Sequence, residues 1–136
     1  MIYVLLMMIF MHILDDFHFQ GCLANLKQKD WWKKNYPQKL YENDYKISLI
    51  MHCFSWAFLT MLPLILFCNV GFLFIIMFAV NIFVHYIVDD LKANQKMISL
   101  TTDQLCHLLQ IFLTWLVIIV WIIFSLVHLT HSLKDI

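Results

Sequence analysis

Arginine is absent from this chain of 136 residues, so all nine basic side chains are lysines. Nine acidic residues balance them, and the formal net charge is zero when the histidines are neutral. Proteins that bind nucleic acid gather Lys and Arg on one face, because these side chains neutralise phosphates. The composition therefore argues against a nucleic-acid partner.

Charged residues of any kind are scarce, at 13% of the chain, and glycine and proline occur only twice each. The four cysteines form no CxxC pair and no regular spacing, which indicates neither a disulfide framework nor a cysteine-rich metal site. Hydrophobic residues, in contrast, make up 62% of the chain, and the mean hydropathy is +0.78. Soluble domains contain about 45–50% apolar residues. The composition thus indicates an integral membrane protein.

Three apolar runs are long enough to cross a bilayer as helices, which takes about 20 residues. They cover 47–68, 70–88 and 105–129 and contain no Lys, Asp or Glu. A shorter run at 1–14 lacks the positively charged start of a signal peptide, and its apolar spacing continues past two carboxylates to Leu26. We therefore predict one all-α domain over 1–136, an antiparallel bundle with transmembrane helices at about 1–26, 47–68, 70–92 and 103–131.

Lysines are distributed unevenly between the ends of these helices. Most of them lie in an aromatic-rich loop at 28–45 and its flanks, two more follow the third helix, and only Lys134 follows the fourth. Aromatic rings alternating with lysines are typical of the water–lipid boundary, which predicts an amphipathic loop along the membrane surface. The positive-inside bias predicts that both Lys-bearing loops are cytoplasmic and both termini outside, and we expect the chain in the cytoplasmic (inner) membrane.

Antiparallel threading places ionisable residues from all four helices at one depth. His12 and Asp16, His85 and Asp89, and Asp103 and His107 are each four residues apart, so both members of a pair share a helix face. His52 begins the second helix at the same end. Imidazole with carboxylate suits zinc, iron or manganese, and zinc is the ion we expect. The predicted ligands of one ion or two are His12, Asp16, His52, His85, Asp89 and His107.

Further polar side chains flank this level and are candidates for catalysis. A spare carboxylate such as Asp103 can act as a general base, and Lys92 suits an anionic lipid or phosphate headgroup. The predicted catalytic set is Asp103, Gln104, Lys92 and Gln20. An alternative stays open, because histidines and aspartates in membrane helices also serve as interhelical hydrogen-bond partners.

Four ordered blocks of the sequence resemble domain-of-unknown-function family 3307, which comprises small bacterial and phage integral membrane proteins. The first block is HxxxDFxxQ with a lysine further on, followed by an isolated histidine, HxxxDxxK and DQxxH. They correspond here to His12, Asp16, Phe17, Gln20 and Lys27; to His52; to His85, Asp89 and Lys92; and to Asp103, Gln104 and His107. Doubled acids at Asp15 and Asp90, and Leu91 in place of an aromatic residue, depart from the pattern. The resemblance implies the grouping of these positions and names no reaction.

Three functions are compatible with these features. A metal-dependent hydrolase acting on a membrane lipid or its headgroup would use the ion to ionise water, and the arrangement is similar, as a fold-level analogy, to membrane-bound metal-dependent hydrolases. A proton or metal carrier would use the same groups as a relay. A non-catalytic interaction protein, related to phage or host defence, would need them only to lock its helices. Membrane lipids are the expected partners, and a bundle this small leaves a homo-oligomer open.

Overall fold

The computed structural model describes residues 1–134, and within them every regular element is helical. Helix α1 (Ile2–Leu14) continues into a π-helical turn, η1 (Asp15–Phe19). Two short helices, α2 (Leu23–Leu26) and α3 (Lys29–Asn35), and a 3-10 turn, η2 (Lys39–Tyr41), lead to the long helices α4 (Asp44–Phe67), α5 (Gly71–Ala93) and α6 (Leu100–Lys134). The all-α prediction is thereby confirmed.

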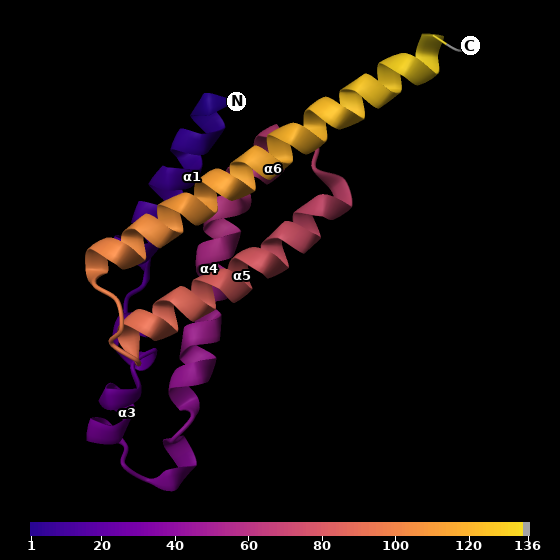
Figure 1. The fold of residues 1–136 in the computed structure, drawn as a ribbon. Helices are drawn as coiled ribbons and strands as arrows, with labels where there is room; N and C mark the ends of the chain where they lie inside the picture. Colours follow the sequence, from indigo (N-terminus) through magenta and orange to yellow (C-terminus); the bar gives the residue numbers. More distant parts are fainter. Residues whose placement is uncertain (135–136) are drawn as a thin grey trace.

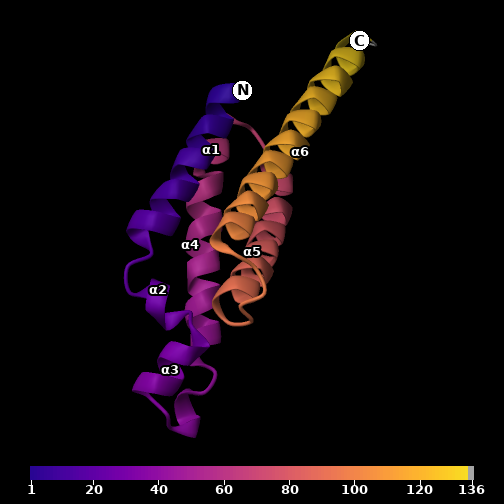
Figure 2. The same cartoon turned by 60° about the vertical axis from the view of Figure 1, so that its left-hand side comes forward.

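Four helices run antiparallel and close into a bundle (Figures 1 and 2). Helix α1 packs against α4, α4 against α5, and α5 against α6, and α6 returns to α1. The start of α1 and the end of α6 lie at one end of the bundle, whereas α3 lies at the opposite end (Figure 2). The C-terminal part of α6 extends beyond the other helices (Figure 1).

Polar and apolar side chains are distributed in the reverse of the pattern found in soluble proteins. Large hydrophobic residues face outward on every long helix, for instance Phe72 with 73% of its surface exposed. Several histidines and aspartates are fully enclosed, among them Asp103. Four helical segments have the length and hydropathy to cross a membrane, namely Ile2–Phe19, Lys39–Phe67, Gly71–Ala93 and Leu100–His128. An apolar exterior around a polar interior is what hydrocarbon as solvent selects, so the chain is a membrane protein.

The first helix differs from the continuous one expected over about 1–26. It widens at Asp15, where the N–H of Gln20 donates to the carbonyl of Asp15 across five residues (3.0 Å), and it breaks at Gly21. Such π-turns rotate the side chains within them and are common at functional sites. Here the turn lets Asp15 and Asp16 both face the bundle, although neighbouring residues of an α-helix diverge by about 100°.

Gly21 has a φ of +49°, in the left-handed region that only glycine enters without strain. A Cβ added at this position would meet its nearest neighbour, the carbonyl oxygen of Phe19, at 3.7 Å, so space is available and the backbone angle is the only obstacle. We expect Gly21→Ala to lower the free energy of unfolding by about 1 kcal/mol, measured by denaturant titration in mixed micelles. Gly21→Asn should cost less, because asparagine tolerates this region. Equal stability of all three proteins would contradict the explanation.

The predicted loop at 28–45 contains α3 and η2. Hydrogen bonds join it to the C-terminal end of α5 and to α2. The N–H of Lys29 donates to Asn94 Oδ1 (2.7 Å), and Trp32 Nε1 donates to the carbonyl of Leu26 (2.6 Å). Lys96 forms an ion pair with Asp30 and thereby lowers the pKa of that carboxyl below its ordinary value.

Helix α4 begins at Asp44 instead of residue 47, and α6 extends from Leu100 to Lys134 instead of 103–131.

Candidate metal centre

The polar residues predicted to share one depth meet between the helices, near the ends of α1 and α5 and the beginnings of α4 and α6. The ring centroids of His85 and His107 are 4.1 Å apart, and those of His12 and His107 are 5.6 Å apart. At most 2% of the surface is exposed for each of His12, His52, His85, Asp89, Asp103 and His107. Four helices therefore contribute to one buried cluster.

Three imidazoles of this cluster lie in series. His52 Nε2 is 3.2 Å from His85 Nε2, and His85 Nδ1 is 3.1 Å from His107 Nδ1. At the end of the series, His107 Nε2 lies 3.3 Å from Asp89 Oδ1 and 3.4 Å from Asp103 Oδ1. Both nitrogens of His85 thus face other imidazole nitrogens, which makes the position of each proton decisive.

When the imidazoles are neutral, the neighbours of His107 assign its proton and that of His85. His107 Nε2 faces only carboxylate oxygens, so it carries a proton, and its Nδ1 accepts from His85 Nδ1–H. The lone pair of His85 Nε2 is then directed at His52 Nε2. On the far side of His52, Nδ1 lies 3.6 Å from Asp15 Oδ2, whereas its Nε2 lies 3.3 Å from Asp89 Oδ2 and 3.3 Å from Gln20 Nε2. With the proton of His52 on Nδ1, two lone pairs face each other at 3.2 Å and repel, and a cation bound to both nitrogens would remove the repulsion.

A carboxylate completes this arrangement. Asp16 Oδ1 lies 3.6 Å from His52 Nε2, and one ligand atom each of Asp16, His52 and His85 lies within 4.8 Å of the other two. Asp16 Oδ1 is buried and has no hydrogen-bond partner among the described residues. His85, Asp89 and His107 form a second such group, which shares His85 with the first. The buried His/Asp cluster can therefore hold a metal ion.

Charge distinguishes the two groups. Lys27 Nζ contacts Asp89 Oδ2 at 2.6 Å, and Lys92 Nζ contacts Asp103 Oδ2 at 2.7 Å, so these two carboxylates already have an ammonium partner. Among the side chains that the structure describes, neither Asp15 nor Asp16 forms an ion pair with a lysine. With neutral imidazoles, four carboxylates and two ammonium groups leave a formal charge of −2 in a site enclosed by apolar helices. One divalent cation at the first group would balance it.

His12 lies in the cluster but outside both groups, although the sequence pattern made it a candidate ligand. Trp56 Nε1 donates to His12 Nδ1 (2.8 Å), and His12 Nε2 is 3.1 Å from Gln104 Oε1. The tryptophan occupies the lone pair of one nitrogen, and the other nitrogen donates its proton to the amide oxygen. The geometry therefore makes His12 a residue that positions Gln104, whose amide nitrogen donates to Asp16 Oδ2 (3.0 Å).

A cavity of about 410 Å³ opens next to the centre. Asp16 and Asp89 line it, as do three of the four residues predicted to be catalytic, namely Gln20, Lys92 and Gln104. The fourth, Asp103, is fully buried and is not among the lining residues; its oxygens face Lys92, Gln104 and His107. Asp103 thus acts on the site through its neighbours.

Sequence reasoning missed two contributors from α4. The indole of Trp56 stacks on His85, with ring centroids 4.1 Å apart and planes inclined by 20°, and Ser55 Oγ donates to Asp15 Oδ1 (2.8 Å). Trp56 lies four residues after His52, on the same helix face, and this spacing could have indicated its place. Nothing in the sequence distinguishes Ser55 from an ordinary helix serine.

The fold and the site define the class of protein: a four-helix membrane protein with a buried His/Asp cluster that can hold a metal ion. Comparison of the chain with protein-family models, curated proteins and solved structures gives no match. The resemblance to family 3307 therefore stays a prediction, which rests on the four motif blocks alone.

Proposed function

We propose that this chain is a zinc-dependent membrane hydrolase, with Asp16, His52 and His85 as ligands and the headgroup of a membrane lipid as its site of attack. The observation that carries the proposal is the buried Asp16 Oδ1, which lacks a hydrogen-bond partner among the described residues and lies 3.6 Å from His52 Nε2, itself 3.2 Å from His85 Nε2. Structural zinc sites use four protein ligands, whereas catalytic ones use three and leave a position open. Two histidines and one carboxylate fit the catalytic pattern.

The groups around these ligands support the same assignment. His107 holds the proton on His85 Nδ1 in place, and Asp89 and Asp103 in turn orient His107. Asp15 faces the outer nitrogen of His52. Carboxylates and hydrogen-bonding groups that fix the ligating imidazoles are typical of zinc sites, where they set the tautomer.

Zinc, when bound, supplies a Lewis acid and lowers the pKa of a coordinated water toward neutrality. The chain's own part is to bind the headgroup. Lys92, a third of whose side chain is exposed, places a cation in the cavity wall for an anionic headgroup. Gln20 and Gln104 offer amide groups beside the ligands. Asp89 also lines this wall, where Lys27 Nζ holds its Oδ2 at 2.6 Å.

The location of the site fits a substrate of the bilayer. The cavity is built from η1, α2, the end of α5 and the beginning of α6, all at the end of the bundle that carries most of the lysines. By the positive-inside bias this end is cytoplasmic, in the cytoplasmic (inner) membrane. Headgroups of the inner leaflet arrive at this level.

Elemental analysis of purified protein, expressed in metal-replete medium, tests the proposal first. We expect one zinc per chain, and hydrolysis of phospholipid in nanodiscs that is lost in Asp16→Asn. Lys92→Gln should raise KM for anionic lipids more than it lowers kcat, because it removes a binding cation. Protein without stoichiometric metal would exclude the zinc enzyme. Full zinc without hydrolysis of any headgroup would exclude the hydrolase and leave a metal-binding protein.

A proton or metal carrier is the second candidate, and the series of imidazoles favours it. A further polar group lies on α5 and α6, where Asn81 Nδ2 donates to Thr114 Oγ1 (2.9 Å) and Gln110 Nε2 donates to Asn81 Oδ1 (2.9 Å). Among the side chains that the structure describes, no hydrogen bond joins this group to the histidines, which argues against a continuous relay. Ion flux in proteoliposomes that disappears with Asp89→Asn would favour the carrier.

A further inference from the structure

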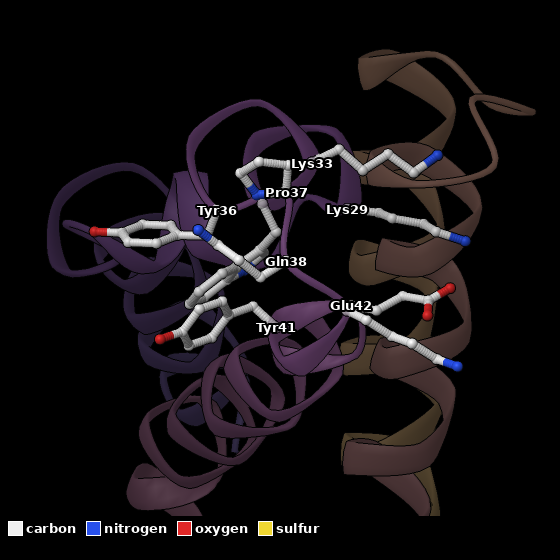
Figure 3. Close-up of a pocket in the computed structure, with 9 residues that line it drawn as sticks. Lys29, Lys33, Tyr36, Pro37, Gln38, Tyr41 and Glu42 are labelled. Carbon is white, nitrogen blue, oxygen red and sulfur yellow. The ribbon is translucent and has the colours of Figure 1, made fainter.

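A second cavity, of about 360 Å³, lies apart from the metal centre in the segment that joins η1 to α4. It is formed by α3, η2 and the residues between and after them (Figure 3). This cavity shares no lining residue with the cavity beside Asp16. The two cavities are therefore separate.

One wall is aromatic. Trp32, Tyr36 and Tyr41 contact one another, with ring centroids 5.5 to 6.3 Å apart. The indole N–H of Trp32 is fixed by the carbonyl of Leu26, which anchors the wall to α2. The tyrosine rings point to one side of the cavity in Figure 3. Tyrosine and tryptophan with an apolar body and a polar tip are the residues that settle at the headgroup level of a bilayer.

The other wall is cationic. Lys29, Lys33 and Lys39 line the cavity together with a single acid, Glu42. Figure 3 shows the ammonium groups of Lys29 and Lys33 on the side away from the tyrosine hydroxyls. Among the described residues no carboxylate lies within ion-pair distance of these three lysines, whereas Lys27, Lys92 and Lys96 each have one. The cavity thus carries an uncompensated positive charge and selects an anion.

We infer that this cavity binds the phosphate of an anionic phospholipid, with the three lysines around the phosphate and the aromatic wall along the glycerol and upper acyl carbons. The occupant is a lipid and not a soluble phosphate for two reasons. The cavity directly precedes α4, and its last three lining residues, Lys39, Tyr41 and Glu42, begin the segment Lys39–Phe67 that can span the membrane. A hydrated inorganic ion would make no favourable contact with the apolar wall of three rings.

Adjacent lysines of α3 provide a matched test, because Lys33 lines the cavity and Lys34 is exposed outside it. Delipidated protein in detergent is titrated with phosphatidylglycerol and, separately, phosphatidylcholine, and bound lipid is counted by native mass spectrometry. We expect Lys33→Gln to weaken phosphatidylglycerol binding about fivefold, the factor for one lysine at a membrane surface. Lys34→Gln should leave it unchanged. Circular dichroism verifies that both variants stay folded.

Three results would overturn the inference. Equal binding of phosphatidylglycerol and phosphatidylcholine would show that the lysines do not select an anion. Equal losses in Lys33→Gln and Lys34→Gln would reduce the effect to general surface charge. Displacement of the lipid by millimolar inorganic phosphate would assign the cavity to a soluble anion. None of these results bears on zinc content, so this inference and the proposed function fail independently.

Discussion

Asparagine in place of Asp16 is expected to lower the affinity for zinc by more than about 100-fold. Removing a group that merely orients a ligand already costs about 10–100-fold, and Asp16 supplies the charged ligand itself. The substitution keeps the size of the side chain and leaves an amide oxygen for the hydrogen bond from Gln104. It therefore removes the negative charge with little disturbance of packing. Competition with a fluorescent chelator measures the affinity in detergent.

Two neighbouring aspartates give a graded control series. Asp15 faces His52 Nδ1 without belonging to either group of candidate ligands, so Asp15→Asn should weaken zinc binding about 10–100-fold. Asp90 accepts from Asn94 and Gln95, each at 2.8 Å, away from the cluster, and Asp90→Asn should have no effect. If Asp16→Asn and Asp90→Asn bind zinc equally well, the assignment of Asp16 is wrong.

The depth of the polar residues could be predicted from the sequence, because depth depends only on helix order and length. Spans free of charge fix where each helix enters the membrane, and antiparallel threading then brings His85 at the end of α5 level with His107 at the start of α6. Four-residue spacing adds that His85 and Asp89 share a face, as do Asp103 and His107. These pairs are in contact in the structure, at 3.7 and 3.4 Å.

The partners of each side chain could not be predicted, because they depend on the rotation of each helix about its axis. One residue of an α-helix corresponds to about 100° of rotation, so small changes in helix phase exchange partners. The π-turn at Asp15 is such a change, and no residue type in the sequence indicates it. Asp16 keeps its Oδ2 3.7 Å from His12 Nδ1 and places its Oδ1 3.6 Å from His52 Nε2, whereas His12 has Trp56 and Gln104 as its hydrogen-bond partners. A sequence pattern that treats His12 and Asp16 as equivalent ligands cannot separate them.

The ion-pair partners of the lysines could not be predicted from the sequence either. The motif resemblance places Lys27 in the first block, and the structure gives it a specific partner on another helix, Asp89, at 2.6 Å. The pair is almost enclosed, with 10% of the lysine side chain and 3% of the aspartate side chain exposed. Asp89 also accepts from His107 beside the candidate ligand His85. Lys27 thus connects the loop that follows η1 to the polar centre of the bundle.

Removing only one member of this pair should be strongly destabilising. In Lys27→Met the apolar stem of the side chain is retained while Asp89 keeps a buried negative charge without its ammonium partner. Breaking a buried ion pair in this way costs about 3–5 kcal/mol, and we expect a loss of that size in the free energy of unfolding. Reversible unfolding in mixed micelles, followed by far-ultraviolet circular dichroism, measures it.

The double variant Lys27→Met/Asp89→Asn distinguishes an ion pair from simple packing. Since the asparagine removes the unpaired charge, most of the lost stability should return, although Asp89→Asn alone also weakens the contact with His107. Lys96→Met is the matched control, because its pair with Asp30 is exposed and salt-screened, and it should leave stability nearly unchanged. Additive losses in the double variant would mean that Lys27 stabilises the bundle through its hydrocarbon contacts. The charge balance that places the cation at Asp16, with Asp89 already neutralised, would then lose its support.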